Sequence, residues 1–145
     1  PEEATGVVAA AQHLQMPVVI GFTVETDGRL PSGMTLGQAI ASVDSATDSW
    51  AAYYMVNCAH PAHFIDALDP HQPWTARIRS IRANASTMSH AELNEAEELD
   101  SGDIHDLAQW YARLRRMLPR INVLGGCCGT DHRHIAAIAQ VVTGR

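Results

Sequence analysis

The chain has 145 residues, of which 46% are hydrophobic and 18% are charged, and its formal net charge at pH 7 is -6. This length is enough for one domain with a hydrophobic core, and the negative balance argues against a nucleic-acid or membrane-surface partner, because phosphate binding needs clustered Lys and Arg. No apolar run approaches the roughly 20 residues of a membrane span, and three cysteines cannot all pair within one chain, so we expect a cytoplasmic protein with reduced thiols.

Four strand–helix units follow an initial helix in the expected order of elements. Strands are expected at residues 17–24, 51–56, 75–83 and 120–124, and helices at 2–15, 35–47, 61–68, 104–118 and, after a cap at Thr130 or Asp131, up to Val142. Residues 84–103 are polar and acidic, which predicts a long surface excursion with one helical turn. The alternation predicts an α/β fold with a parallel sheet, either a small doubly wound sheet or half of an eight-stranded barrel.

All three cysteines lie just past the end of an expected strand. Cys58 follows an apolar run and Asn57, and the other two stand in the sequence Gly125-Gly126-Cys127-Cys128-Gly129-Thr130. Both candidate architectures bring the carboxyl ends of their strands to one edge of the sheet, so the three thiols are expected to meet there. Adjacent cysteines in a strand point to opposite faces, and the glycines give the backbone the freedom to bring both to one metal ion.

Three thiolates predict a zinc site with one open position, which is typical of catalytic rather than structural zinc. Such a site keeps one net negative charge, so it is poor at making hydroxide and better at holding a fourth thiolate that stays nucleophilic. The residues therefore suggest a thiol substrate that attacks an electrophilic carbon. Taken singly, a cysteine in the position of Cys58 is more often a small packed hydrophobe than a metal ligand, and the two glycines could form only a turn.

Four histidines stand near the cysteines, namely His60, His63, His132 and His134. A structural zinc site with three cysteines and one of these histidines is conceivable. His132 and His134 are two residues apart and point to different faces of a helix, so we expect surface positions or helix-end roles for the four.

These motifs resemble the homocysteine S-methyltransferases. The resemblance lies in Asn57-Cys58 after a strand, in the Gly-Gly-Cys-Cys-Gly-Thr motif, in the stretch from Gly21 to Gly33, and in Arg82-Ala83-Asn84-Ala85. It implies that residues 1–145 are part of a homocysteine-binding (βα)8 TIM barrel, namely its C-terminal half with strands five to eight, and that the N-terminal half is absent from this chain. It also implies one Zn²⁺ ion held by Cys58, Cys127 and Cys128.

The resemblance implies methyl transfer to the thiol of homocysteine, giving methionine, with S-methylmethionine, S-adenosylmethionine, betaine or methylfolate as the donor. Thr23, Asn57 and Asn84 are candidate substrate-binding residues, although Asn57 is equally explained as a turn residue and Thr23 as a strand cap. The acidic residues that hold the substrate's amino group in the family have no counterpart here.

Because a half-barrel exposes two sheet edges, we expect a homo-oligomer or a missing N-terminal half. The alternative function is a non-catalytic zinc-binding half-barrel that serves as a structural or assembly module.

Overall fold

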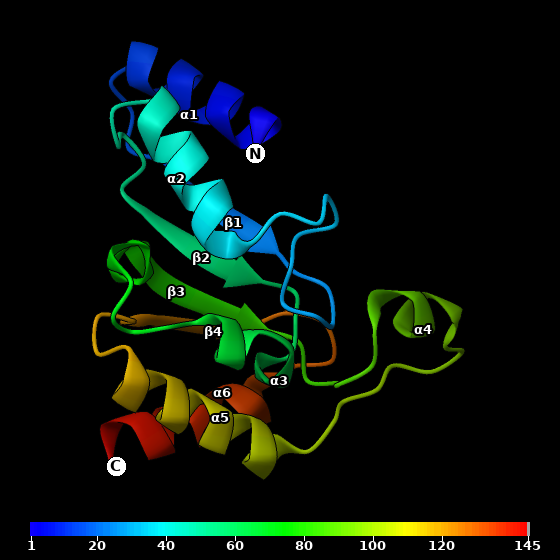
Figure 1. Ribbon diagram of the computed structural model, residues 1–145. Coiled ribbons are helices and arrows are strands. Elements are labelled where there is room, and N and C mark those ends of the chain that lie inside the picture. Colours follow the sequence, from blue (N-terminus) through cyan, green and yellow to red (C-terminus); the bar gives the residue numbers. More distant parts are fainter. Residues whose placement is uncertain (145) are drawn as a thin grey trace.

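Four parallel strands form the centre of the molecule in the computed structural model, which describes residues 1–144 (Figure 1). The sheet order is β1-β2-β3-β4, so that each strand pairs with its neighbour in sequence. The strands are β1 (Val19–Thr23), β2 (Tyr53–Asn57), β3 (Ile78–Ala83) and β4 (Val123–Gly126). A doubly wound sheet reverses its strand order at a switch point, whereas a barrel does not. The sequential order is therefore consistent with half of a TIM barrel.

Within residues 1–144, six α-helices and two 3₁₀ segments connect and cover these strands. They are α1 (Glu2–His13), α2 (Leu36–Ala46), α3 (Pro61–Phe64), η1 (Ile65–Ala67), η2 (Pro73–Arg77), α4 (His90–Glu95), α5 (Ile104–Met117) and α6 (His132–Thr143). Side chains of Thr35, Asp103 and Asp131 accept hydrogen bonds from backbone N–H groups at the starts of α2, α5 and α6. None of the helices within residues 1–144 is both long and apolar enough to cross a membrane.

All four strands begin two or three residues later than the sequence predicts, and the cause is visible for β3 and β4. Residues 73–77 form a 3₁₀ turn that starts at Pro73, so β3 begins at Ile78 rather than at residue 75. Ile121 closes a turn by donating its N–H to the carbonyl of Leu118, so β4 begins at Val123 rather than at residue 120. This strand continues through Gly125 and Gly126, which pair with Arg82 and Ala83 of β3. The expected helix at residues 61–68 is one α-helical turn followed by a 3₁₀ turn.

The helices cover one face of the sheet and leave the other open. Ile20, Phe22, Tyr54, Val56 and Ile81 face the helices and are buried. On the opposite face, Val19 is 38% exposed and Val123 is 43% exposed. The uncovered face corresponds to the interior of a complete barrel, which closes with eight strands.

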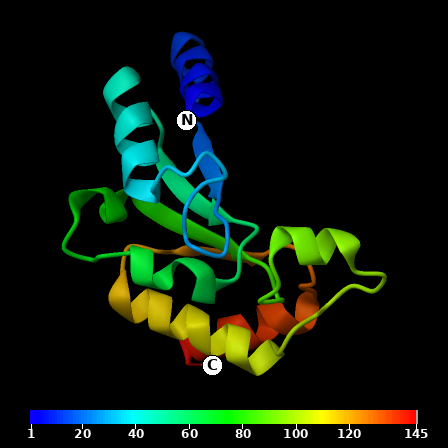
Figure 2. The ribbon, with the colours of Figure 1, turned by 45° about the vertical axis from the view of Figure 1, so that its right-hand side comes forward.

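Residues 84–103 form the expected excursion between β3 and α5, and α4 lies within it. Figures 1 and 2 show α4 standing away from the sheet, beyond the ends of β2 and β3. Ser89 caps this helix, and Glu92 completes a capping box by accepting from the N–H of Ser89 at 2.8 Å. The excursion therefore contains the predicted helical turn, at the end of the sheet where the cysteines lie.

Candidate metal centre

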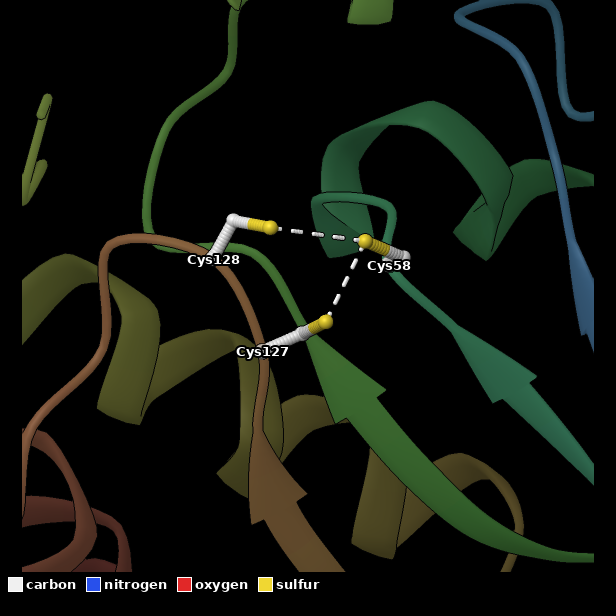
Figure 3. A group of neighbouring side chains, drawn as sticks. All are labelled: Cys58, Cys127 and Cys128. Atoms are coloured by element: carbon white, nitrogen blue, oxygen red, sulfur yellow. Dashed lines mark hydrogen bonds between the residues drawn. The ribbon is translucent and has the colours of Figure 1, made fainter.

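The sulfur atoms of Cys58, Cys127 and Cys128 point toward one another (Figure 3). The Sγ atom of Cys58 lies 3.1 Å from that of Cys127 and 3.6 Å from that of Cys128, and all three lie within 4.8 Å of one another. All three thiols are free. Cys58 is half-buried between the other two, and Cys128 is exposed. The structure thus brings the three predicted ligands together at the carboxyl ends of β2 and β4.

The turn that carries Cys127 and Cys128 is fixed by hydrogen bonds to the last residue of β3 and to the segment that follows it. Cys127 donates its N–H to the carbonyl of Ala83 at 2.8 Å, and the carbonyl of Cys128 accepts from the N–H of Ala85 at 3.0 Å. Gly129 then adopts a φ of 76°, in the left-handed region that favours glycine. The backbone of Gly125 and Gly126 stays out of that region. Of the three glycines, Gly129 is therefore the one with a positive φ. Gly126 lies so close to Thr130 that no Cβ would fit there.

Cys58 has an unusual backbone conformation with a φ of 56°. A side chain in this left-handed region costs about 1–2 kcal/mol, so the surrounding contacts must hold it. The N–H of Cys58 donates to the carbonyl of Arg82 at 2.9 Å. Its carbonyl accepts two hydrogen bonds, from Nδ2 of Asn84 at 3.0 Å and from Nε2 of His90 at 2.6 Å. Both lone pairs of this carbonyl are therefore used.

The three sulfurs fit a tetrahedral metal ion with thiolate ligands. Zn–S bonds of about 2.3 Å place neighbouring sulfurs about 3.8 Å apart. The distance between Cys58 and Cys128 is close to this value, and that between Cys58 and Cys127 requires the two sulfurs to separate by a fraction of an ångström. Burial raises the pKa of the Cys58 thiol well above its usual range, and the neighbouring thiols add to this effect. A raised pKa disfavours the thiolate of Cys58. The three sulfurs therefore need a cation among them in order to be ionised together.

His90 and Glu25 contact the site although the sequence did not suggest them. Nδ1 of His90 lies 3.1 Å from Oε2 of Glu25, while its Nε2 bonds the Cys58 carbonyl. The pKa of His90 is raised above its ordinary value by the hydrogen bond to this carbonyl and, against the effect of burial, by Glu25. Nothing in the sequence indicates these contacts, because Glu25 and His90 are 65 residues apart and the acceptor on Cys58 is a backbone atom. The sequence offers Ser89 with Glu92 three residues later, a pattern that indicates a helix start near His90 but no contact with Cys58.

The other predicted site residues lie at the same edge of the sheet. Thr23 and Asn57 are the last residues of β1 and β2 and are paired in register. Asn84 follows β3 and is buried, and it contacts Cys58 directly. The Oδ1 atoms of Asn57 and Asn84 are buried and have no hydrogen-bond partner among residues 1–144. These two amide oxygens are acceptors without donors.

Two of the four histidines are buried at helix starts, so for them the surface alternative is wrong and the helix-end alternative fits. His60 is buried at the start of α3, where its Nδ1 accepts from the N–H of Ala62, and burial lowers its pKa to about 4. His134 is buried as well, and its Nε2 bonds the carbonyl of Ser101 at 2.9 Å. His132 is exposed, as expected. The group of metal-ligating side chains found within residues 1–144 consists of the three cysteines without a histidine.

The sequence model of one protein family, described as homocysteine S-methyltransferase, matches residues 1–142. The chain belongs to the homocysteine S-methyltransferase family. A search of curated proteins found no match to it. The family is one of methyltransferase enzymes, and the cysteine cluster of this member is compatible with a metal site.

Proposed function

We propose that this chain carries the metal half of a zinc-dependent homocysteine S-methyltransferase site. The observation that supports this most is the convergence of three free thiols, within 4.8 Å, at the carboxyl edge of a parallel sheet. In a barrel of this kind, that edge is where active sites lie. The family match over residues 1–142 adds the reaction class, which is methyl transfer to a thiol.

In the proposed reaction the sulfur of homocysteine forms a bond to the methyl carbon of the donor. The bond from that carbon to the donor's sulfur or nitrogen breaks, the leaving group keeps the electron pair, and the thiol proton passes to solvent. Zn²⁺ bound by the three sulfurs would supply a positive charge that holds the substrate sulfur as a thiolate. Cys58, Cys127 and Cys128 are the proposed ligands, and methionine is the product.

The chain's polar groups at the sheet edge are proposed to orient the substrate. The Oδ1 atoms of Asn57 and Asn84 are buried acceptors whose missing donors an ammonium group on the substrate would supply. Asn84 also donates to the Cys58 carbonyl, so it links the proposed substrate pocket to a proposed ligand. Thr23, next to Asn57 in the sheet, is a third candidate for this role.

Metal analysis and a methyl-transfer assay test the proposal. The reduced chain is expected to hold about one zinc ion, and Cys58→Ala, Cys127→Ala and Cys128→Ala are each expected to lose it. Sulfur ligation measured by X-ray absorption should rise from three to four on adding homocysteine. The assay pairs homocysteine with S-methylmethionine, S-adenosylmethionine, betaine and methylfolate in turn. A reduced chain that holds no metal would refute the proposal.

The second candidate is a zinc-binding half-barrel without catalysis, acting as a structural or assembly module. The uncovered sheet face and the unpaired edges of β1 and β4 favour it, because such surfaces invite further packing. Zinc that stays bound by three sulfurs in the presence of homocysteine, with no product from any donor, would identify this alternative.

A further inference from the structure

We propose that Glu25 and His90 form a latch that ties the start of α4, within residues 84–103, to the sheet edge that carries the three thiols, and that fixes the backbone of Cys58. In this role both are positioning residues, since they act through the carbonyl of Cys58. The imidazole of His90 bridges two elements, with Nδ1 3.1 Å from Oε2 of Glu25 and Nε2 2.6 Å from the Cys58 carbonyl. Glu25 follows β1, Cys58 follows β2, and His90 belongs to the excursion.

The latch matters because α4 lacks a buried apolar face. Each of its six residues is exposed or half-buried, and it stands away from the sheet (Figure 2). A helix of this length is not stable by itself. His90 is its first residue, so the two hydrogen bonds of the imidazole attach the start of the helix to the body of the protein. The base of the excursion is tied separately, where Ser101 accepts from His134 and Thr87 accepts from His63.

The backbone of Glu25 lies in a hydrogen-bonded turn, which gives the latch an anchor on the body of the protein. Its N–H donates to the carbonyl of Arg29 at 2.8 Å, and its carbonyl accepts from the N–H of Gly28 at 3.0 Å. Gly28 has a φ of 75°, and a Cβ there would approach the carbonyl oxygen of His63 to 2.9 Å. The turn at 25–29 is therefore packed against α3, close to the segment that follows Cys58.

At Cys58 the latch acts on a strained residue. The left-handed φ of Cys58 persists because its N–H and its carbonyl are both engaged, the latter by His90 and Asn84 together. Removing His90 takes away the shorter of the two bonds to this carbonyl. The Cys58 sulfur is then expected to leave the position from which it meets Cys127 and Cys128.

The first test needs no metal. Amide hydrogen exchange of the reduced, metal-free chain is expected to be about tenfold faster over residues 86–95 in His90→Ala than in the parent. Alkylation by iodoacetamide, mapped by mass spectrometry, should become faster at Cys58 relative to Cys128, which is already exposed and serves as an internal reference. His90→Gln keeps an N–H donor, so its exchange and alkylation rates should lie between those of the parent and of His90→Ala. His13→Ala, at an exposed histidine, should change neither rate.

A double-mutant cycle of Glu25 and His90 tests whether the two residues act together, as a latch requires, or make independent contacts. Glu25→Ala should move both readouts in the same direction as His90→Ala, and the double variant should add little to the effect of His90→Ala alone. Glu25→Gln keeps a hydrogen-bond acceptor and should behave almost as the parent. Circular dichroism of each variant should match the parent apart from the small signal of the six-residue α4, since the hydrophobic core is untouched.

The zinc readout rests on the proposed metal site and is measured separately. Competition with a chromogenic chelator should show about 10–100-fold weaker zinc binding in His90→Ala, the range found for outer partners of metal ligands. Parent-like exchange and alkylation in His90→Ala would overturn the latch. Altered exchange with unchanged zinc affinity would overturn the positioning of Cys58. A parent chain without zinc would refute the proposed function, while exchange and alkylation would still decide the latch.

Discussion

The hydroxyl group of Thr130 occupies space that a side chain at Gly126 would need. A Cβ at position 126 would overlap Oγ1 and Cβ of Thr130. The same hydroxyl donates to the carbonyl of Cys127 at 2.7 Å, and the N–H of Thr130 donates to that carbonyl at 3.2 Å. Gly126 ends β4, so the close approach packs the end of the strand against the turn that presents two of the thiols.

Gly126→Ala is expected to lower the free energy of unfolding by about 1–3 kcal/mol, the usual cost of overpacking, and to weaken zinc binding. The added methyl group forces Thr130 and the Cys127–Cys128 turn to move. Gly125→Ala is the matched control, because a Cβ there meets only the flexible side chain of Arg82, at 3.4 Å. Urea unfolding and chelator competition measure the two effects. Equal behaviour of the two variants would contradict the packing argument.

The architecture of the site could be predicted because its ligands follow strands. Strand–helix alternation placed Cys58, Cys127 and Cys128 at one sheet edge, and the structure confirms their convergence. The sequence left two architectures open, and the order β1-β2-β3-β4 favours the half-barrel. The strand order depends on which strands pair, and local hydrophobic and turn patterns in the sequence do not specify that pairing.

What sequence reasoning missed depends on contacts between distant residues. His90 looked like one polar residue in an acidic excursion, and its acceptor at Cys58 is a carbonyl oxygen that every residue type has. The late start of β4 has a similar cause. Ile121 is apolar and fully buried, as a strand residue would be, yet its N–H is used in a turn with Leu118. Apolar character records burial, not the hydrogen-bond pattern.

Tyr111→Phe is expected to destabilise the protein by about 1–3 kcal/mol. The Tyr111 hydroxyl is buried between β3 and β4, where it accepts from the N–H of Ala83 at 2.9 Å and donates to the carbonyl of Gly125 at 2.5 Å. The variant leaves two backbone groups without this partner, so zinc binding by the cysteines that follow β4 should also weaken. Urea unfolding measures the loss. Tyr53→Phe, at a half-buried residue, is the control and should cost much less.

Stability is expected to fall above about pH 10, in part because of Tyr54. Burial raises the pKa of Tyr54 above its ordinary value, and the hydrogen bond to Oδ1 of Asp44 at 2.7 Å adds to this. The folded state therefore keeps a proton that the unfolded state has already released. The contribution is complete below pH 10 and is lost as the pH rises toward the raised pKa.

Tyr54→Phe tests this origin of the alkaline sensitivity. The variant loses the hydrogen bond to Asp44, so it should be less stable at neutral pH, but its unfolding free energy should fall less steeply above pH 10. Tyr53→Phe, on the opposite face of β2, is the control for removing a hydroxyl group from the same strand. Urea unfolding at several pH values between 8 and about 11 gives both slopes. A slope that Tyr54→Phe does not change would assign the sensitivity to other groups.

Cys58→Gly is expected to be more stable than Cys58→Ala by about 0.5–1 kcal/mol in the reduced, metal-free chain. Glycine adopts the φ of 56° without the cost that a Cβ brings, and this gain exceeds the greater entropy that glycine has in the unfolded chain. The two variants lack the same sulfur, so the comparison isolates the backbone. Urea unfolding measures it, and equal stability would show that Cys58 is not strained. If the predicted order holds, the parent spends stability to place a thiol where glycine would fit better, which is the pattern expected when a strained residue serves a site.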